Sequence, residues 1–345
     1  MGLIIGTGMT FEPNGCRLGI KVAKGGDAAM RTGSFASSLI CISICVGSTL
    51  AVVRSSPARA ETACQKEPEC AFWLRQGSQG TDWLLPFPPF HIIGNVYFVG
   101  SKDLGTYLIV TPKGNILINP DFDGNVPMIK DSIAKLGFKY ADTKILLISH
   151  SHSDHNGAAA QVIKDTGAKY DVMAQDVPVV ESGGKADFNY GKMPGSLYPP
   201  AHVDRVLHDG DKVELGGTVL TAVLTPGHTK GCTTWTMTAR EGGKSYNVVI
   251  VGSPNINPGY RLVNNAEYPN IADDYRKTFQ ILKSLHPDFF LGAHPDYFNG
   301  EAKYARMKAG GANPFIDPEG YKAYIAERQA NFEKTLAQQQ ADARK

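Results

Sequence analysis

The sequence has almost no excess of charge of either sign. Its 345 residues include 35 Lys and Arg against 33 Asp and Glu, which leaves a formal charge of +2 at neutral pH. No dense block of Lys and Arg occurs, so the charge pattern does not indicate a nucleic-acid partner. Hydrophobic residues make up 42% of the chain, which is enough to bury a large core. The composition predicts a globular protein whose function must be sought in local motifs.

The chain also has little that could anchor it in a membrane. Its apolar stretch at 39–53 is too short to span a bilayer comfortably. Arg31 precedes this stretch, and "ARA" at 58–60 follows it with the small-x-small form of a signal-peptidase site. We therefore expect a secretory signal peptide that is cleaved after Ala60, with an uncleaved membrane anchor as the alternative.

Residues 1–29 look like neither a targeting segment nor a domain, so Met30 is a candidate start of translation. We expect residues 1–60 to be an N-terminal extension with the signal peptide. Residues 61–345 should form one domain, because no internal repeat, low-complexity tract or Pro/Gly/Ser linker divides them. The mature protein would then be periplasmic, without a stable membrane partner.

Cysteine is scarce as well. Only three of the six Cys residues follow the expected cleavage site, namely Cys64, Cys70 and Cys232. In an oxidising compartment an odd number predicts one pair and one free thiol. Cys64 and Cys70 are close enough to bridge across a turn, which would leave Cys232 free and buried. The alternative is that all three are unpaired.

Strand and helix patterns alternate along the rest of the chain. Short apolar or alternating runs predict strands at 95–101, 106–112, 114–120, 143–149, 172–175, 218–226, 233–239, 246–253 and 288–294. Helical spacing of apolar residues predicts helices at 126–138, 158–167, 271–285 and 318–342. This alternation in two successive halves predicts an α/β fold with two sheets face to face and helices outside.

The most informative motif is "SHSHSDH" at 149–155, directly after a buried-type strand. His150, His152 and Asp154 alternate, so they would point the same way in an extended backbone. His155 would point the other way unless the chain turns. A turn is expected because Asp154 or Asn156 stands where a helix N-cap belongs. Four such groups buried together without a metal would leave polar atoms unpaired, so the motif favours metal binding.

Two more histidines follow predicted strands, His228 in "LTPGHTKG" and His294 in "FFLGAHP". Zinc binds imidazole nitrogen and carboxylate oxygen, and a catalytic zinc keeps one position open for water. Two ions therefore need about six protein ligands, and the motif with His228 and His294 offers six. The remaining histidines lack partnered spacing and are interpreted as ordinary hydrogen-bonded residues: His91, His202, His208 and His286.

With these residues in view, the chain resembles the metallo-β-lactamase superfamily, whose hallmark is H-x-H-x-D-H. The resemblance runs from about residue 90 to 315 and implies a four-layer αββα sandwich. Ser253 stands where glyoxalase-type members carry an Asp that bridges both metals. This Ser, together with "TPGHTKGCTTWT" and "LGAHPDYF", resembles the third, His-rich subclass of metallo-β-lactamases.

The resemblance implies two Zn²⁺ ions per chain, the first held by His150, His152 and His228. The second would be held by Asp154, His155 and His294. The chain departs from the subclass at two positions. Gly252 replaces a Cys that could pair with Cys232, and Asn255 replaces a second Ser that helps to bind the substrate carboxylate. Asn255 can still donate a hydrogen bond there, beside Ser253.

The implied function is hydrolysis of the β-lactam amide bond, and so antibiotic resistance, by a hydroxide that bridges the metals. Asp154 would serve both as ligand and as orienter of this nucleophile. The expected partner is a small β-lactam substrate, and the protein is expected to be a monomer. Two alternatives stay open: another hydrolase of the same fold, such as a lactonase or thioesterase, and a secreted zinc-binding protein without turnover.

Overall fold

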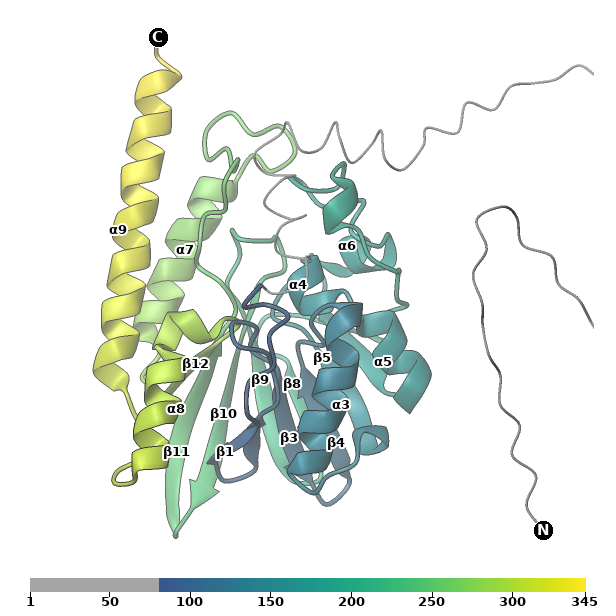
Figure 1. Ribbon diagram of the computed structural model, residues 1–345. Helices are drawn as coiled ribbons and strands as arrows, with labels where there is room; N and C mark the ends of the chain where they lie inside the picture. Colours follow the sequence, from purple (N-terminus) through teal and green to yellow (C-terminus); the bar gives the residue numbers. More distant parts are fainter. Residues whose placement is uncertain (1–80) are drawn as a thin grey trace, which may run out of the picture. The chain divides into compact units, whose positions relative to one another are not determined.

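Two β-sheets lie at the centre of the part of the chain that the computed structural model describes, residues 81–345 (Figure 1). The first sheet has seven strands in chain order, and the second has five in the order β12-β11-β10-β9-β8. The first comprises β1 (Phe90–Ile93), β2 (Val96–Phe98), β3 (Tyr107–Thr111), β4 (Gly114–Ile118), β5 (Thr143–Leu147), β6 (Lys169–Met173) and β7 (Arg205–Leu207). The second comprises β8 (Lys212–Leu215), β9 (Thr218–Leu224), β10 (Thr233–Glu241), β11 (Lys244–Val251) and β12 (Phe289–Gly292).

Both faces of the central strands are covered by other elements, and the side chains on both faces are apolar. In β4, Ile116 and Ile118 belong to the core between the sheets, whereas Leu117 points to the outer core beneath the helices. All three side chains are fully buried. β4 pairs in parallel with β5, and β5 with β6, as is common for strands covered on both sides.

Helices cover the outer faces of both sheets (Figure 1). On the first sheet, α3 (Val126–Lys135) and α5 (Ala159–Thr166) contribute Ile129, Ile133 and Val162 to the outer core. On the second sheet, α7 (Ile271–Ser284) and α9 (Pro318–Asp342) contribute aromatic residues to the main core. The expected αββα sandwich is therefore confirmed, with residues 90–207 forming one sheet and 212–292 the other.

The long predicted elements are confirmed, and the short ones were less well predicted. The predicted helix 318–342 coincides with α9. The predicted strand 172–175 was displaced, because β6 occupies Lys169–Met173. Sequence patterns also missed the edge strands β1, β7 and β8 and the helices α6 (Val177–Glu181) and α8 (Gly300–Ala309). These elements are too short or too polar to show a clear hydrophobic period.

Several predictions concern residues outside 81–345 and so stay predictions: the cleavage after Ala60, the start at Met30 and the Cys64–Cys70 bridge. Within the described range, no helix is long and apolar enough to cross a membrane.

Candidate metal centre

The ends of strands from both sheets place the histidine motif. The segment 148–152 follows β5 and leads into a single helical turn, α4 (Ser153–Asn156). Ser149 fixes the start of this segment, because its N–H donates to the Asn119 side-chain oxygen at 2.7 Å. Its carbonyl accepts a hydrogen bond from the Thr233 N–H of β10, also at 2.7 Å. The motif is therefore fastened to the first sheet and to the second.

The predicted turn is present, but the predicted cap was wrong. The N-cap of α4 is His152, and that of α5 is Ala158; neither uses a side chain. Asp154 and Asn156 lie inside α4 instead. Their side chains are occupied elsewhere: the Asp154 carboxylate contacts His155, and the Asn156 oxygen accepts a hydrogen bond from the Tyr170 hydroxyl.

One group of metal-capable side chains consists of His150, His152 and His228. Their ring centroids lie 4.5–4.8 Å apart. All three rings are buried, and one ligand atom from each lies within 4.8 Å of those of the other two. The structure thus brings together the three residues that the sequence assigned to the first ion.

A second group adjoins the first and contains Asp154, His155 and His294. The Asp154 Oδ2 atom lies 3.2 Å from His155 Nε2 and 3.5 Å from His294 Nε2. The two Nε2 atoms are 3.1 Å apart. His150 also lies within 4.8 Å of the ligand atoms of Asp154 and His155, so the two groups are continuous.

The donor set fits a metal because several of its buried atoms have no other partner. Neither ring nitrogen of His150 has a hydrogen-bond partner among the described residues. The same is true of Asp154 Oδ1 and His155 Nδ1. Leaving such atoms unpaired in the interior is unfavourable by about 1–3 kcal/mol each. Coordination by divalent ions would give a partner to one ring nitrogen of His150 and to the Asp154 carboxylate, and imidazole with carboxylate is a donor set that zinc accepts.

In three of the histidines, a hydrogen bond to one ring nitrogen determines that the other nitrogen faces the metal-capable side chains. His228 Nδ1 donates to the Asn255 carbonyl, and His294 Nδ1 donates to the Asp103 carbonyl, each at 2.8 Å. Both rings therefore turn Nε2 inward. Around His152 the geometry is reversed, because its Nε2 lies 3.4 Å from the Tyr260 hydroxyl. That hydroxyl donates to the His228 carbonyl at 2.6 Å, so towards His152 it accepts, which leaves Nδ1 for the metal.

Burial and neighbouring charges shift the titration of these groups. Burial lowers the pKa of His150 and of His228 well below the usual value, and neighbouring histidines add to the effect. Burial alone would raise the pKa of Asp154, but His155 and His294 outweigh it and hold that pKa well below the usual value. In His150, His228 and Asp154 the shifts thus favour neutral imidazole and ionised carboxylate, the forms that bind a metal ion. In His152 and His294 neighbouring groups outweigh burial and raise the pKa.

Asp176, which sequence reasoning missed, ties two ligand segments together. Its Oδ2 atom accepts hydrogen bonds from the Ser151 N–H at 3.0 Å and the Thr229 hydroxyl at 2.8 Å, and its Oδ1 accepts from the Gly231 N–H at 2.8 Å. Ser151 lies between two ligand histidines, and Thr229 follows a third. A Cβ at Gly231 would lie 2.6 Å from the Asp176 backbone nitrogen, so only glycine permits this approach.

Asp121 supports the second group from the end of β4. Its Oδ2 accepts a hydrogen bond from the Thr106 hydroxyl at 2.7 Å, and its carbonyl accepts from the Ala158 N–H at 2.8 Å. Burial raises the pKa of Asp121 to about 7, and the nearby charge of Asp154 adds to the rise. Asp121 and Asp176 both stand just beyond a predicted strand, so the strand-end rule that found the histidines could have found them too.

The two predicted substrate-binding residues lie on the segment after β11. The Ser253 hydroxyl is 3.1 Å from the hydroxyl of Tyr297, a neighbour of the His294 ring. The Asn255 side-chain oxygen accepts from Arg328 of α9 at 3.4 Å. Asn255 thus supports His228 through its carbonyl while its side chain faces α9, and its contact with substrate stays a prediction.

Cys232 is free and fully buried, as predicted. Its Sγ lies 3.5 Å from the Ser253 carbonyl oxygen. A Cβ at Gly252 would lie 2.9 Å from this sulfur, so Gly at this position leaves Cys232 room, and Cys232 has no disulfide partner among the described residues.

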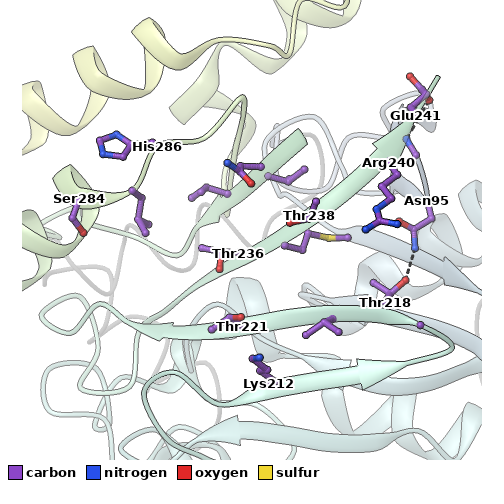
Figure 2. A pocket seen from close by; sticks show the side chains of 18 residues that line it. Asn95, Lys212, Thr218, Thr221, Thr236, Thr238, Arg240, Glu241, Ser284 and His286 are labelled. Carbon is purple, nitrogen blue, oxygen red and sulfur yellow. Dashed lines mark hydrogen bonds between the residues drawn. The ribbon is translucent and has the colours of Figure 1, made fainter. Parts of the chain in front are cut away.

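The structure also has a groove of about 1100 Å³, whose lining side chains are drawn in Figure 2. Threonines of β9 and β10, among them Thr221, Thr236 and Thr238, line part of it, and none of the six predicted ligands does. His286, which was interpreted as an ordinary histidine, lines this groove and belongs to none of the groups of three or more metal-capable side chains among the described residues.

Comparison with known proteins identifies the family. A profile of the Metallo-beta-lactamase superfamily matches residues 106–294. A probable metallo-hydrolase of Burkholderia pseudomallei is 34% identical over 183 residues, and a hydroxyacylglutathione hydrolase of Hyphomonas neptunium is 35% identical over 83. The matched regions cover 60% and 25% of the lengths of these two relatives.

Solved structures match over nearly their whole length. Native FEZ-1 metallo-beta-lactamase from Legionella gormanii is 55% identical with a TM-score of 0.74, covering 74% of this chain and 98% of that one. BJP-1, a subclass B3 metallo-beta-lactamase of Bradyrhizobium japonicum, is 40% identical with a TM-score of 0.72, covering 76% and 98%. The class B3 di-zinc enzyme LRA-12 from an Alaskan soil metagenome is 37% identical with a TM-score of 0.71, covering 74% and 97%. With its sandwich fold and its H-x-H-x-D-H metal centre, the chain belongs to the metallo-β-lactamase superfamily.

Proposed function

We propose that this protein is a zinc-dependent β-lactamase of subclass B3, which hydrolyses the amide bond of β-lactam antibiotics and so confers resistance. The observation that carries the proposal is the convergence of six candidate ligands from three separate segments. Five of them are buried and the side chain of His294 is 13% exposed, and unpartnered atoms lie on His150, Asp154 and His155. Solved metallo-β-lactamases that match most of this chain support the substrate class.

We further propose two zinc ions, held as the sequence implied: His150, His152 and His228 for one ion, and Asp154, His155 and His294 for the other. Zinc in such a site supplies a Lewis acid and a water that is acidic near neutral pH. The protein's own contribution is to hold the ligands in one orientation and to exclude bulk water. The backbone carbonyls of Asn255 and Asp103 orient His228 and His294, respectively.

Substrate binding is assigned to the segment after β11. The Ser253 hydroxyl is oriented by the Tyr297 hydroxyl and could donate to the carboxylate of a β-lactam ring. Asn255 would add a second donor if its amide turned from Arg328 towards the substrate. Loss of one such polar contact should weaken binding more than it slows the chemical step.

The variants His152→Ala, Asp154→Ala and Ser253→Ala test this function. One positioned electrostatic stabiliser contributes about 3–4 kcal/mol to a barrier, and losing a metal removes more than one. We expect the first two variants to lose nearly all turnover of a penicillin, a cephalosporin and a carbapenem, with reduced zinc content. Ser253→Ala should mainly raise KM. Equal losses in all three variants would contradict these roles.

A substrate panel separates this proposal from its alternatives. A lactone and a thioester should be hydrolysed far more slowly than β-lactams, and EDTA should abolish β-lactam turnover reversibly. Preferred turnover of the thioester or lactone would instead assign a different hydrolase activity to the same site. Zinc uptake without turnover of any substrate would indicate a zinc-binding protein.

Periplasmic location, cleavage after Ala60, the Cys64–Cys70 bridge and a monomeric state belong to the same proposal. The apolar stretch at 39–53 and the "ARA" sequence support export. N-terminal sequencing of protein from the periplasmic fraction should begin at Glu61, and its mass should correspond to one chain in solution. A mature protein that retains residues 1–60 would contradict the export proposal.

A further inference from the structure

Asp187 brings a surface loop into contact with the metal centre. It lies in the loop 182–200, outside the histidine motif, and its side chain is 5% exposed. Its Oδ2 atom is 3.5 Å from His152 Nε2. Its Oδ1 accepts hydrogen bonds from the backbone N–H groups of Asn189 at 2.8 Å and Tyr190 at 2.6 Å. One carboxylate therefore holds the turn of the loop and faces a predicted metal ligand.

The same loop reaches the ligand segment at two other points. The Tyr190 ring packs against His152 with centroids 5.3 Å apart and donates its hydroxyl to the Pro258 carbonyl at 3.3 Å. The Tyr198 hydroxyl donates to the Ser151 carbonyl at 2.6 Å. The conformation of the loop and the position of His152 are therefore linked.

The role of Asp187 depends on which ring nitrogen of His152 carries the proton. Tyr260 gives its own proton to the His228 carbonyl, and an ionised carboxylate has none to give. Towards His152 Nε2, Asp187 and Tyr260 can each only accept, and this favours the tautomer with the proton on Nε2. Of the two, the carboxylate is the stronger acceptor, because hydrogen bonds to ionised groups are about twice as strong.

We propose that Asp187 is a positioning residue that orients His152 towards the metal and makes the order of the loop 182–200 depend on metal binding. This inference rests on the metal site proposed above. Ligand histidines commonly donate their second N–H to a carboxylate, and losing that acceptor lowers metal affinity about 10–100-fold. By reciprocity, a bound metal that fixes His152 also stabilises the loop that holds it.

The variant Asp187→Asn tests the inference with little change in shape. Asn can still accept from the Asn189 and Tyr190 N–H groups, but its amide N–H₂ would face the His152 N–H. The imidazole would then favour the other tautomer, which places a proton on the nitrogen meant for the metal. The matched control is Asp211→Asn, because the Asp211 carboxylate accepts from the His208 N–H at 2.8 Å in a turn away from the site.

Three measurements are made on each protein: Zn²⁺ affinity by competition with a chromophoric chelator, thermal unfolding without metal, and amide hydrogen exchange over 182–200 with and without Zn²⁺. For Asp187→Asn we expect a 10–100-fold loss of affinity, with a metal-free unfolding midpoint like that of the parent. Zinc should slow exchange in the loop of the parent and of Asp211→Asn, and much less in that of Asp187→Asn.

Parental zinc affinity in Asp187→Asn would overturn the inference and leave the proposed function intact. The inference would also be overturned if amide hydrogen exchange over 182–200 in the parent were the same with and without Zn²⁺. If the parent itself bound no zinc, the proposed function would fail, and the inference with it.

Discussion

At the scale of single residues, the metal centre depends on carboxylates outside the histidine motif. Asp176 joins the segments of His152 and His228, and Asp187 faces His152 from a separate loop. The six ligands could be predicted because their residue types and strand-end positions are unusual. Asp176 also follows a predicted strand, but the sequence could not single it out, because a single Asp after a strand is common and its partners are distant in the sequence.

Away from the metal centre, Asp171 of β6 should make stability depend on pH. Burial raises the pKa of Asp171 from its usual 3.8 to about 6, although Arg205 at 3.6 Å opposes the rise. Because the folded pKa is the higher one, the folded state binds this proton more tightly. The carboxyl group therefore destabilises the fold progressively as pH rises through about 4 to 6, and fully above that.

The variant Asp171→Asn should remove this pH-dependent contribution. We expect it to unfold at a higher urea concentration than the parent at pH 7.5, with a gain of about 1 kcal/mol once solvent screening is allowed for. At pH 4 the two metal-free proteins should differ less. A gain that is the same at both pH values would contradict the proposed pH dependence. A loss at pH 7.5 would show that the Asp171–Arg205 pair stabilises the fold instead.

At the scale of elements, the junction of α8 and α9 depends on one ion pair between a buried lysine and a partly exposed aspartate. The Lys303 ammonium of α8 is 1% exposed and lies 2.8 Å from Asp317 Oδ2. Asp317 is also the N-cap of α9, where its Oδ1 accepts from the Gly320 N–H at 2.9 Å. The sequence predicted α9 from its helical pattern but gave no sign of α8, whose buried positions are few and include this lysine.

The variant Asp317→Ala should destabilise the protein by about 3 kcal/mol or more, because it leaves the buried Lys303 ammonium without its carboxylate and removes the N-cap of α9. Glu319→Ala is the matched control: Glu319 pairs with Lys322 at 2.7 Å, but both side chains are exposed, so the loss should be less than about 1 kcal/mol. Urea denaturation of both variants measures the difference. Similar losses in the two would contradict the importance of the Lys303–Asp317 pair.

At the scale of the whole molecule, the metal centre joins segments that lie far apart in the chain. His150 and His294 are 144 positions apart, and their segments follow strands of different sheets. An ion bound by both segments would hold the two sheets together in the folded state only. Binding to the folded state alone raises the free energy of unfolding by about 2.7 kcal/mol at a free metal concentration of 100 times Kd.

Zinc should therefore stabilise the protein as well as activate it. We expect the thermal midpoint to rise when zinc is added to EDTA-treated protein, and to rise less in Asp154→Ala, which lacks a ligand of the second group. Differential scanning calorimetry checks both expectations. Identical midpoints with zinc and with EDTA would argue against a metal that bridges the two halves.

The sequence by itself determined the fold class, the long strands and helices, and the set of six candidate ligands. Each of these depends on local periodicity or on residue types placed within a few positions of a strand end. Only the tertiary structure decided how the ligands are oriented. His294 donates to the carbonyl of Asp103, which lies 191 positions away, and His152 is held by a loop that carries no metal motif. Such contacts form between backbone and side-chain atoms that meet only when the two sheets pack, so no local pattern records them.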